Sequence, residues 1–322
     1  MKEAKFIDRN KDKWARMEQL QGLDADQLAV NFVNLSDDLS YAKTFYPGSK
    51  VVDYLNKLIT SYQINIYSRQ GIRQKGMLSF WIEELPALFY REKRTLGFAF
   101  IFFGLACVVG AFSAFRNGDF VRLIMGDAYV NETLKNIADG TPMGIYASTG
   151  AWEMFFGITL NNIKVSFLAF AMGILFSAGT LWVLFSNGVM LGAFLCFFFE
   201  QGLGLHASLS IWAHGTFEIT SIILAGGAGL VMGNSFLFPG TYGRAYSFRQ
   251  GALRGIKIVF GLIPFFVVAG AIESFVTRHA DAHPFVGACA ILLSLVGVVG
   301  YFVGYPYYLH KKEFYGKNQF EC

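Results

Sequence analysis

The feature that most constrains this chain is a series of long apolar stretches that begins near residue 95. The first, Leu96–Phe115, contains no charged side chain. At 1.5 Å per residue, about 20 helical residues cross the ~30 Å hydrocarbon core of a bilayer. Over the whole chain only 16% of residues are charged and 54% belong to the AVILMFWYC set, whereas soluble domains have about 25% charged residues. We therefore expect an all-α, polytopic helical membrane protein.

The number of spans depends on how these stretches divide. Residues 163–199 form one apolar run that is too long for a single crossing, and it is interrupted near Gly179 and at Ser186–Gly188. We expect two spans here, joined by a tight turn. The prediction is six spans within a membrane domain at 95–310, with a loop near 116–162. The spans are Leu96–Phe115, two within 163–199, Ile211–Met232, Ile256–Phe275 and Phe285–Tyr305.

Basic residues at the ends of the spans predict the orientation. Loops on the cytoplasmic side of a membrane carry an excess of Lys and Arg. With six spans, three basic clusters fall on one side, so both termini and the tail 311–322 are expected in the cytoplasm, and the loop 116–162 outside. The clusters are Arg91, Lys93 and Arg94; Arg244, Arg249, Arg254 and Lys257; and Lys311, Lys312 and Lys317.

Residues 1–76 have the pattern of a small cytosolic helical domain. Two apolar stripes recur at three- and four-residue steps, which places each on one face of a helix. Asp24 or Asp26 would cap the first helix, and Pro47–Gly48 would end it. A shorter helix around Trp14 completes the bundle, which is either a cap or a docking module for a partner. The stripes are Leu28, Phe32, Leu35, Leu39 and Ala42, and Val51, Leu55, Leu58, Tyr62 and Ile66; the shorter helix adds Met17 and Leu20.

The segment 77–94 combines crowded aromatic and apolar residues with the basic sequence Arg91–Arg94. Aromatic rings and cations of this kind suit the headgroup region of a bilayer. We expect an interfacial amphipathic helix that leads into the first span.

Three ionisable residues fall within the predicted spans. His214 and Glu218 are four residues apart, so they share one face of the fourth span, and Glu273 lies near the outer end of the fifth. A buried imidazole or carboxylate is costly in hydrocarbon unless it is paired. We therefore expect His214 and Glu218 to bond each other, with Glu273 as a third member of this intramembrane polar cluster.

Three interpretations of the cluster stay open. It is a structural tie between two spans, a polar path in which Glu218 and Glu273 carry protons or cations, or a metal site. The metal interpretation has the least support, because HG-x2-E contains one His and lacks the HExxH motif of zinc proteases. No catalytic residue, metal or cofactor is therefore predicted.

Other polar and small residues in the spans are expected to serve packing. Asn162 and Asn187 would cap helix ends or bond between helices, as Asn commonly does in membrane proteins. Glycines let two helices approach closely, and one pair has GxxxG spacing. The glycines expected in such contacts are Gly188, Gly192, Gly215, Gly227 and Gly229.

These residues occur in an order that resembles the stage II sporulation protein M family of bacterial membrane proteins. The family pattern is Asn, NG-x3-G, HG-x2-E and a late E-x-F, matched here at Asn162, Asn187–Gly192, His214–Glu218 and Glu273–Phe275. Ala213 departs from the proline that often precedes the HG pair. The N-terminal half is also similar to longer family members, at Trp14, Leu39–Tyr46, Tyr54–Leu58 and Leu85–Arg91.

The resemblance implies a non-enzymatic membrane scaffold in the bacterial inner membrane. The namesake of the family is thought to hold peptidoglycan-degrading partners at the septal membrane. The expected partners are thus the lipid bilayer, other membrane or envelope proteins, and a second copy in a homo-oligomer. A net charge of +4 without an organised basic face predicts no nucleic-acid binding. The alternatives are a channel or transporter for an ion or small solute and, third, an intramembrane metal hydrolase.

Overall fold

The computed structural model describes residues 2–19, 23–71, 77–139, 150–276 and 284–318. These residues form helices and connecting turns, with no strand among them. The chain divides into two compact units, Met1–Leu78 and Ser79–Cys322.

The N-terminal unit is a bundle of three helices, α1 (Glu3–Met17), α2 (Ala25–Phe45) and α3 (Lys50–Gly71). Asp24 caps α2, because its Oδ1 accepts a hydrogen bond from the Gln27 amide at 2.7 Å while the Gln27 side chain accepts one from the Asp24 amide. Gly48, with φ of +82°, forms the turn between α2 and α3. The expected N-terminal helical domain is confirmed.

The core of this unit is made by the predicted stripes. Leu28, Leu35, Leu55 and Tyr62 are almost completely buried, and residues of α1 pack on them. The Tyr62 hydroxyl donates a hydrogen bond to the carbonyl of Met17 at 2.8 Å, which ties α3 to the end of α1. Leu20 lies outside the described residues, as does the side chain of Ile66.

The second unit contains six helices long and apolar enough to cross a membrane, within the part of the chain that the structure describes. The prediction of a six-span helical membrane protein is confirmed. The spans are α6 (Lys93–Arg116), α10 (Ala151–Ala171) with η2 (Met172–Ile174), α11 (Ala178–Glu200), α12 (Gly204–Leu237), α13 (Arg244–Ala271) with η3 (Ile272–Val276), and α14 (Pro284–Val298) continued by η5 (Val299–Gly304) and α15 (Tyr305–Asn318).

The boundaries of the second and third spans differ from the expected ones. Helix α10 begins at Ala151, so the connection after the first span is shorter than 116–162. The turn between α10 and α11 lies at Phe176 and Ser177, which have φ of 52° and 67°. This turn comes two residues before Gly179 and so agrees with the first expected interruption, whereas Ser186–Gly188 lie inside α11. Gly188 does not break α11 because it packs closely against Phe103 and Ala106 of α6.

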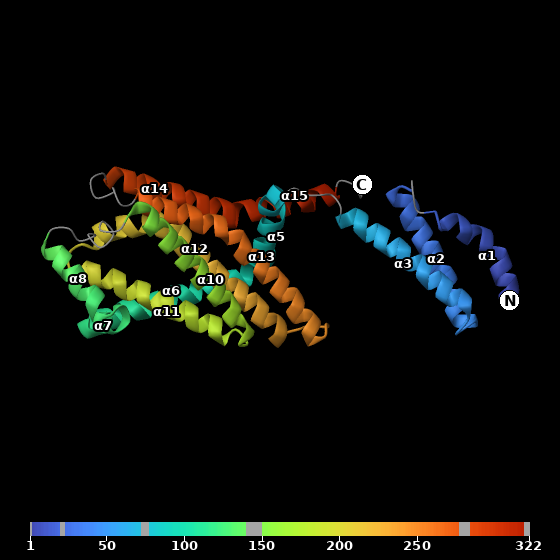
Figure 1. The fold of residues 1–322 in the computed structure, drawn as a ribbon, viewed down its shortest axis with the longest axis horizontal. Helices are drawn as coiled ribbons and strands as arrows, with labels where there is room; N and C mark the ends of the chain where they lie inside the picture. The colour runs from blue at the N-terminus through green and yellow to red at the C-terminus, as the bar shows by residue number, and fades with distance from the viewer. Residues whose placement is uncertain (1, 20–22, 72–76, 140–149, 277–283, 319–322) are drawn as a thin grey trace. The chain divides into compact units, whose positions relative to one another are not determined.

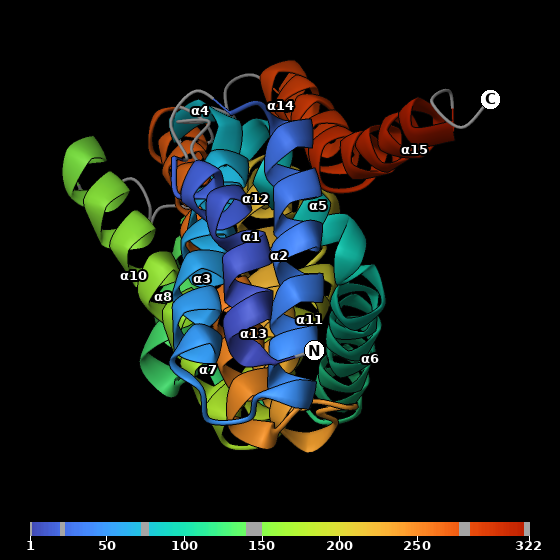
Figure 2. The same ribbon diagram turned by 90° about the vertical axis from the view of Figure 1, so that its right-hand side faces the viewer.

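Helix α12 is the centre of the membrane domain. In its most apolar stretch 83% of residues are buried, against 17–44% in the other five spans. It contacts α6, α10, α11, α13 and α14, whereas α6 and α14 lie on the outside of the bundle (Figure 2). Polar residues on α12 are therefore enclosed by protein.

The segment between α6 and α10 contains two short helices, α7 (Gly118–Met125) and α8 (Asp127–Ala138). The Asn117 side chain caps α7 by accepting from the Asp119 amide. Val121 and Val130 pack against Phe197 and Phe198 of α11. Figure 1 places α7 and α8 at the end of the six-helix body opposite α5.

Residues 77–91 form three short pieces, α4 (Met77–Ser79), η1 (Phe80–Glu84) and α5 (Leu85–Arg91). Leu85 and Phe89 are buried in a cluster with Leu262 of α13. The Trp81 indole donates a hydrogen bond to the Gly261 carbonyl at 3.1 Å. The apolar residues of the expected interfacial helix are thus used to dock it on the membrane helices.

Candidate functional site

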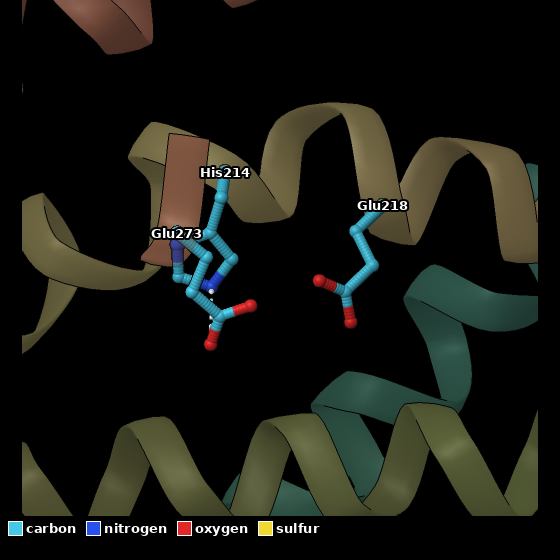
Figure 3. Close-up of side chains that lie close together, drawn as sticks. All are labelled: His214, Glu218 and Glu273. Atoms are coloured by element: carbon cyan, nitrogen blue, oxygen red, sulfur yellow. Dashed lines mark ion pairs between the residues drawn. The ribbon is translucent and has the colours of Figure 1, made fainter. Parts of the chain in front are cut away.

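The intramembrane polar cluster is assembled from two spans. His214 and Glu218 lie one turn apart on α12, and Glu273 comes from η3 at the end of α13. One imidazole nitrogen and one oxygen of each carboxylate all lie within 4.8 Å of one another. Figure 3 shows the three side chains converging on one point beside α12.

Within the cluster, the imidazole of His214 is paired with the carboxyl group of Glu273. The distance from His214 Nε2 to Glu273 Oε1 is 3.6 Å, and only 13% and 9% of the two side chains are exposed. The partner expected from sequence was Glu218, because it shares the helix face with His214. Glu218 lies beside this pair, and the Asn162 side chain of α10 lines the same cavity.

The backbone around Glu273 brings it to the cluster. Residues Ile272–Val276 form a π-helical turn, a departure from α-helix that is often found at functional sites. Just before it, Gly270 lies so close to α10 that a Cβ there would be 2.2 Å from Thr159 Oγ1. On the other side, Ser294 of α14 donates a hydrogen bond to the Ala213 carbonyl at 3.0 Å. The π-helical turn, the close approach of α10 and the hydrogen bond from α14 thus position the cluster together.

A cavity of about 460 Å³ contains the three residues. Its polar wall adds Asn161 and Asn162 of α10 and Asn187 of α11 to the cluster, and none of the described residues that line it is Lys or Arg. The cavity is also lined by apolar and aromatic residues from α6, α7, α8 and α11, namely Phe103, Ile124, Met125, Tyr129, Met190, Leu191 and Phe194. The polar cluster thus lies in a partly open cavity whose remaining lining is mostly apolar.

One atom of the cluster lacks a hydrogen-bond partner. Glu273 is 7% exposed, and its Oε2 is buried without a hydrogen bond among the described residues. A buried polar atom left in this way costs about 1–3 kcal/mol, and more when it is charged. Glu273 therefore has a free acceptor beside the His214 and Glu218 side chains.

The two asparagines expected at helix ends lie within helices, because α10 starts earlier than predicted and α11 continues through Asn187. Asn187 Nδ2 donates to the Val183 carbonyl of its own helix at 2.8 Å. Asn162 is 8% exposed. Both asparagines line the cavity.

Four of the five glycines lie at close helix contacts. A Cβ on Gly192 would be 1.9 Å from the Cys107 carbonyl oxygen of α6, and one on Gly188 would be 2.7 Å from Ala106 Cβ. Gly227 and Gly229 are equally close to residues of other helices. Gly215 differs, because a Cβ there would meet only Ile211 and Ile219 of α12, at 3.4 Å. Its missing side chain leaves space in the cavity.

Sequence reasoning did not place Asn161 or Tyr129 at the site. Asn161 is adjacent to Asn162 and could have been found by asking which polar residues the second span carries. Tyr129 lies on α8, outside the spans, and no local pattern connects it with α12.

The fold and the cavity define a class: a six-span helical membrane protein with ionisable residues enclosed around a central helix. Residues 99–278 match the family described as stage II sporulation protein M, a range that includes the whole intramembrane polar cluster. The chain belongs to the stage II sporulation protein M family. Residues 4–68 match a domain of unknown function (DUF8413), which corresponds to the N-terminal unit. No curated protein and no solved structure matches the chain.

Proposed function

We propose that this protein is a non-enzymatic scaffold of the bacterial inner membrane that positions envelope-remodelling partners. The observation that carries the proposal is the pairing of a separate helical unit with a six-span body, each matched by its own family. A membrane anchor joined to a compact helical module is the arrangement that a positioning protein needs.

The N-terminal unit also offers a surface for a partner. Leu28 and Leu35 of α2 are buried in its core, whereas Val30 and Val33 on another face of this helix are 59% and 57% exposed. Exposed valines beside each other on a folded helix provide an apolar contact that a protein partner would cover.

Co-purification of the full chain in mild detergent tests the scaffold. We expect a cell-wall hydrolase or another envelope protein at a fixed ratio to the chain. We also expect the double variant Val30→Glu/Val33→Glu to lose a cytoplasmic partner while Thr60→Glu, an exposed position on α3, retains it. Recovery of the chain alone or only as a homo-oligomer would contradict the proposal.

The proposed orientation places both termini in the cytoplasm and α7 and α8 outside. The support is the positive-inside rule, which applies to the basic residues near α5 and at the α12–α13 connection. Cysteine labelling tests it in a background where the native cysteines are Ser. In intact cells, with the outer membrane permeabilised where one is present, an impermeant maleimide should label Asp119→Cys and leave Ser40→Cys unlabelled. The reverse pattern would invert the topology.

A second candidate function is a channel or transporter for an ion or small solute, and the polar cavity favours it. Carboxylates enclosed at membrane depth are typical of ion and proton paths. Proteoliposomes test this candidate: Glu218→Gln should abolish flux, whereas Glu153→Gln, an exposed carboxylate of α10, should not. Wild-type vesicles as tight as empty ones across ions and pH would eliminate the candidate.

A further inference from the structure

We propose that His214, Glu218 and Glu273 form a binding site for a divalent transition-metal cation within the membrane domain. The site is independent of the scaffold and of any transport, because it follows from the donor atoms and charges of the cavity alone.

The geometry of the donors is close to what a metal requires. Bonds of about 2.0–2.2 Å in a tetrahedral site place neighbouring ligand atoms roughly 3.4 Å apart. His214 Nε2 and Glu273 Oε1 are already 3.6 Å apart, and an oxygen of Glu218 lies within 4.8 Å of both donor residues. A small rotation of the Glu218 side chain closes the remaining gap, and the adjoining cavity has room for it.

The carboxylates of the cavity favour a bound cation. Two carboxylates face each other in a membrane interior, and no Lys or Arg lines the cavity among the residues that the structure describes. Protonated His214 could neutralise one carboxylate but not both. A divalent cation with neutral His214 balances the two negative charges completely, which removes the main cost of burying them.

The free Oε2 of Glu273 is an independent indication of a ligand. This atom is buried and has no hydrogen-bond partner among the described residues. Glu273 as a whole is only 7% exposed. A metal bound by Glu273 would satisfy this carboxylate. Asn162 lines the same cavity as Glu218 and would orient a second ligand, as outer polar groups commonly do at metal sites.

The donor set indicates which metals fit. One imidazole nitrogen with two carboxylate oxygens suits Zn²⁺ and Mn²⁺ and related first-row ions. Mg²⁺ and Ca²⁺ prefer oxygen ligands alone and more of them. We expect transition metals to bind at least tenfold more tightly than Mg²⁺ or Ca²⁺, with the open coordination positions facing the cavity.

The test uses the full chain in detergent after removal of metal with a chelator. Titration with Zn²⁺ should load about one ion per chain, measured by elemental analysis and calorimetry. Glu273→Gln and His214→Ala should each weaken binding roughly 100-fold, since loss of an outer-shell partner alone costs 10–100-fold. Glu153→Gln removes an exposed carboxylate outside the cavity and should bind as the wild type does.

A second measurement keeps the proposal testable if the cluster variants do not fold. Co²⁺ added to the wild-type chain should give a visible absorption band of nitrogen- and oxygen-ligated cobalt, and Zn²⁺ should displace it. Loading far below one ion per chain, no displaceable cobalt band, or equal binding by folded Glu273→Gln protein would each overturn the metal site.

Discussion

The Nε2 atom of His214 on α12 lies 3.6 Å from Oε1 of Glu273 on η3, so the two residues join the fourth and fifth spans inside the membrane domain. Each side chain is nearly enclosed, with 13% and 9% exposed. The contact is therefore largely shielded from water. Each side chain provides a polar partner for the buried polar atoms of the other.

This pairing predicts that His214→Ala destabilises the protein more than Asn162→Ala. Removing the imidazole leaves Glu273 buried without its partner, and breaking a buried pair in this way costs about 3 kcal/mol. A single polar contact between membrane helices is worth only ~0.6 kcal/mol on average. Thermal unfolding in detergent compares the two variants, and equal melting temperatures would contradict the prediction.

Close packing of α11 on α6 predicts that Gly192→Ala is destabilising. The added Cβ would be 1.9 Å from the Cys107 carbonyl oxygen, and backbone atoms there cannot move aside cheaply. We expect a loss of about 1–3 kcal/mol. Gly97→Ala on α6 is the matched control, since nothing lies within 4 Å of its Cβ position. A melting temperature of Gly192→Ala equal to that of Gly97→Ala would be inconsistent with this packing.

Arg254 forms an ion pair with Glu92 at the α5 end of the bundle, and this pair predicts that the Arg254 side chain stabilises the fold. Its Nε lies 2.8 Å from Oε1 of Glu92, and the two side chains are 21% and 14% exposed. We expect Arg254→Ala to cost about 1–2 kcal/mol, more than the 0–1 kcal/mol of an exposed pair. Arg249→Ala, an exposed position on the same helix, should change the melting temperature little. Similar losses for the two variants would argue against the pair.

The N-terminal unit should lose stability at high pH through Tyr54. Burial, together with a hydrogen bond from its hydroxyl to Glu18 at 2.8 Å, raises the pKa of Tyr54 from 10 to about 12. The folded state thus holds this proton more tightly than the unfolded state. Its stabilisation is complete below pH 10 and is lost as the pH rises from 10 towards 12. Wild-type chain should lose melting temperature more steeply than Tyr54→Phe over this range, and parallel curves would exclude the effect.

Local patterns in the sequence were sufficient for the secondary structure and the number of spans. The stripes around Leu35 and Leu55 predicted α2 and α3, because a helical period depends only on neighbours three and four residues away. The stretch from Leu96 predicted a span because its length and lack of charge are local properties. The HG-x2-E motif in the same way placed His214 and Glu218 on one helix face.

The spacing of residues along the chain could not predict which residues of different spans contact each other. The early start of α10 was missed because Glu153, Asn161 and Lys164 lower the apolar character of its first half. The turn at Phe176 and Ser177 contains no glycine or proline itself, and Gly179, two residues later, marked its place only approximately. Gly188, which suggested a second break, instead serves a contact with α6, and such a contact depends on the neighbouring helix.

By itself, then, the sequence determined a helical N-terminal unit, six membrane spans and the presence of ionisable residues within them, since periodicity and hydropathy act locally. Only the tertiary structure decided that Glu273 pairs with His214 and that Asn161 and Asn187 share their cavity. The physical reason is that the packing of α10, α11 and α13 around α12 fixes these neighbours, and packing depends on the shapes of surfaces far apart in the chain.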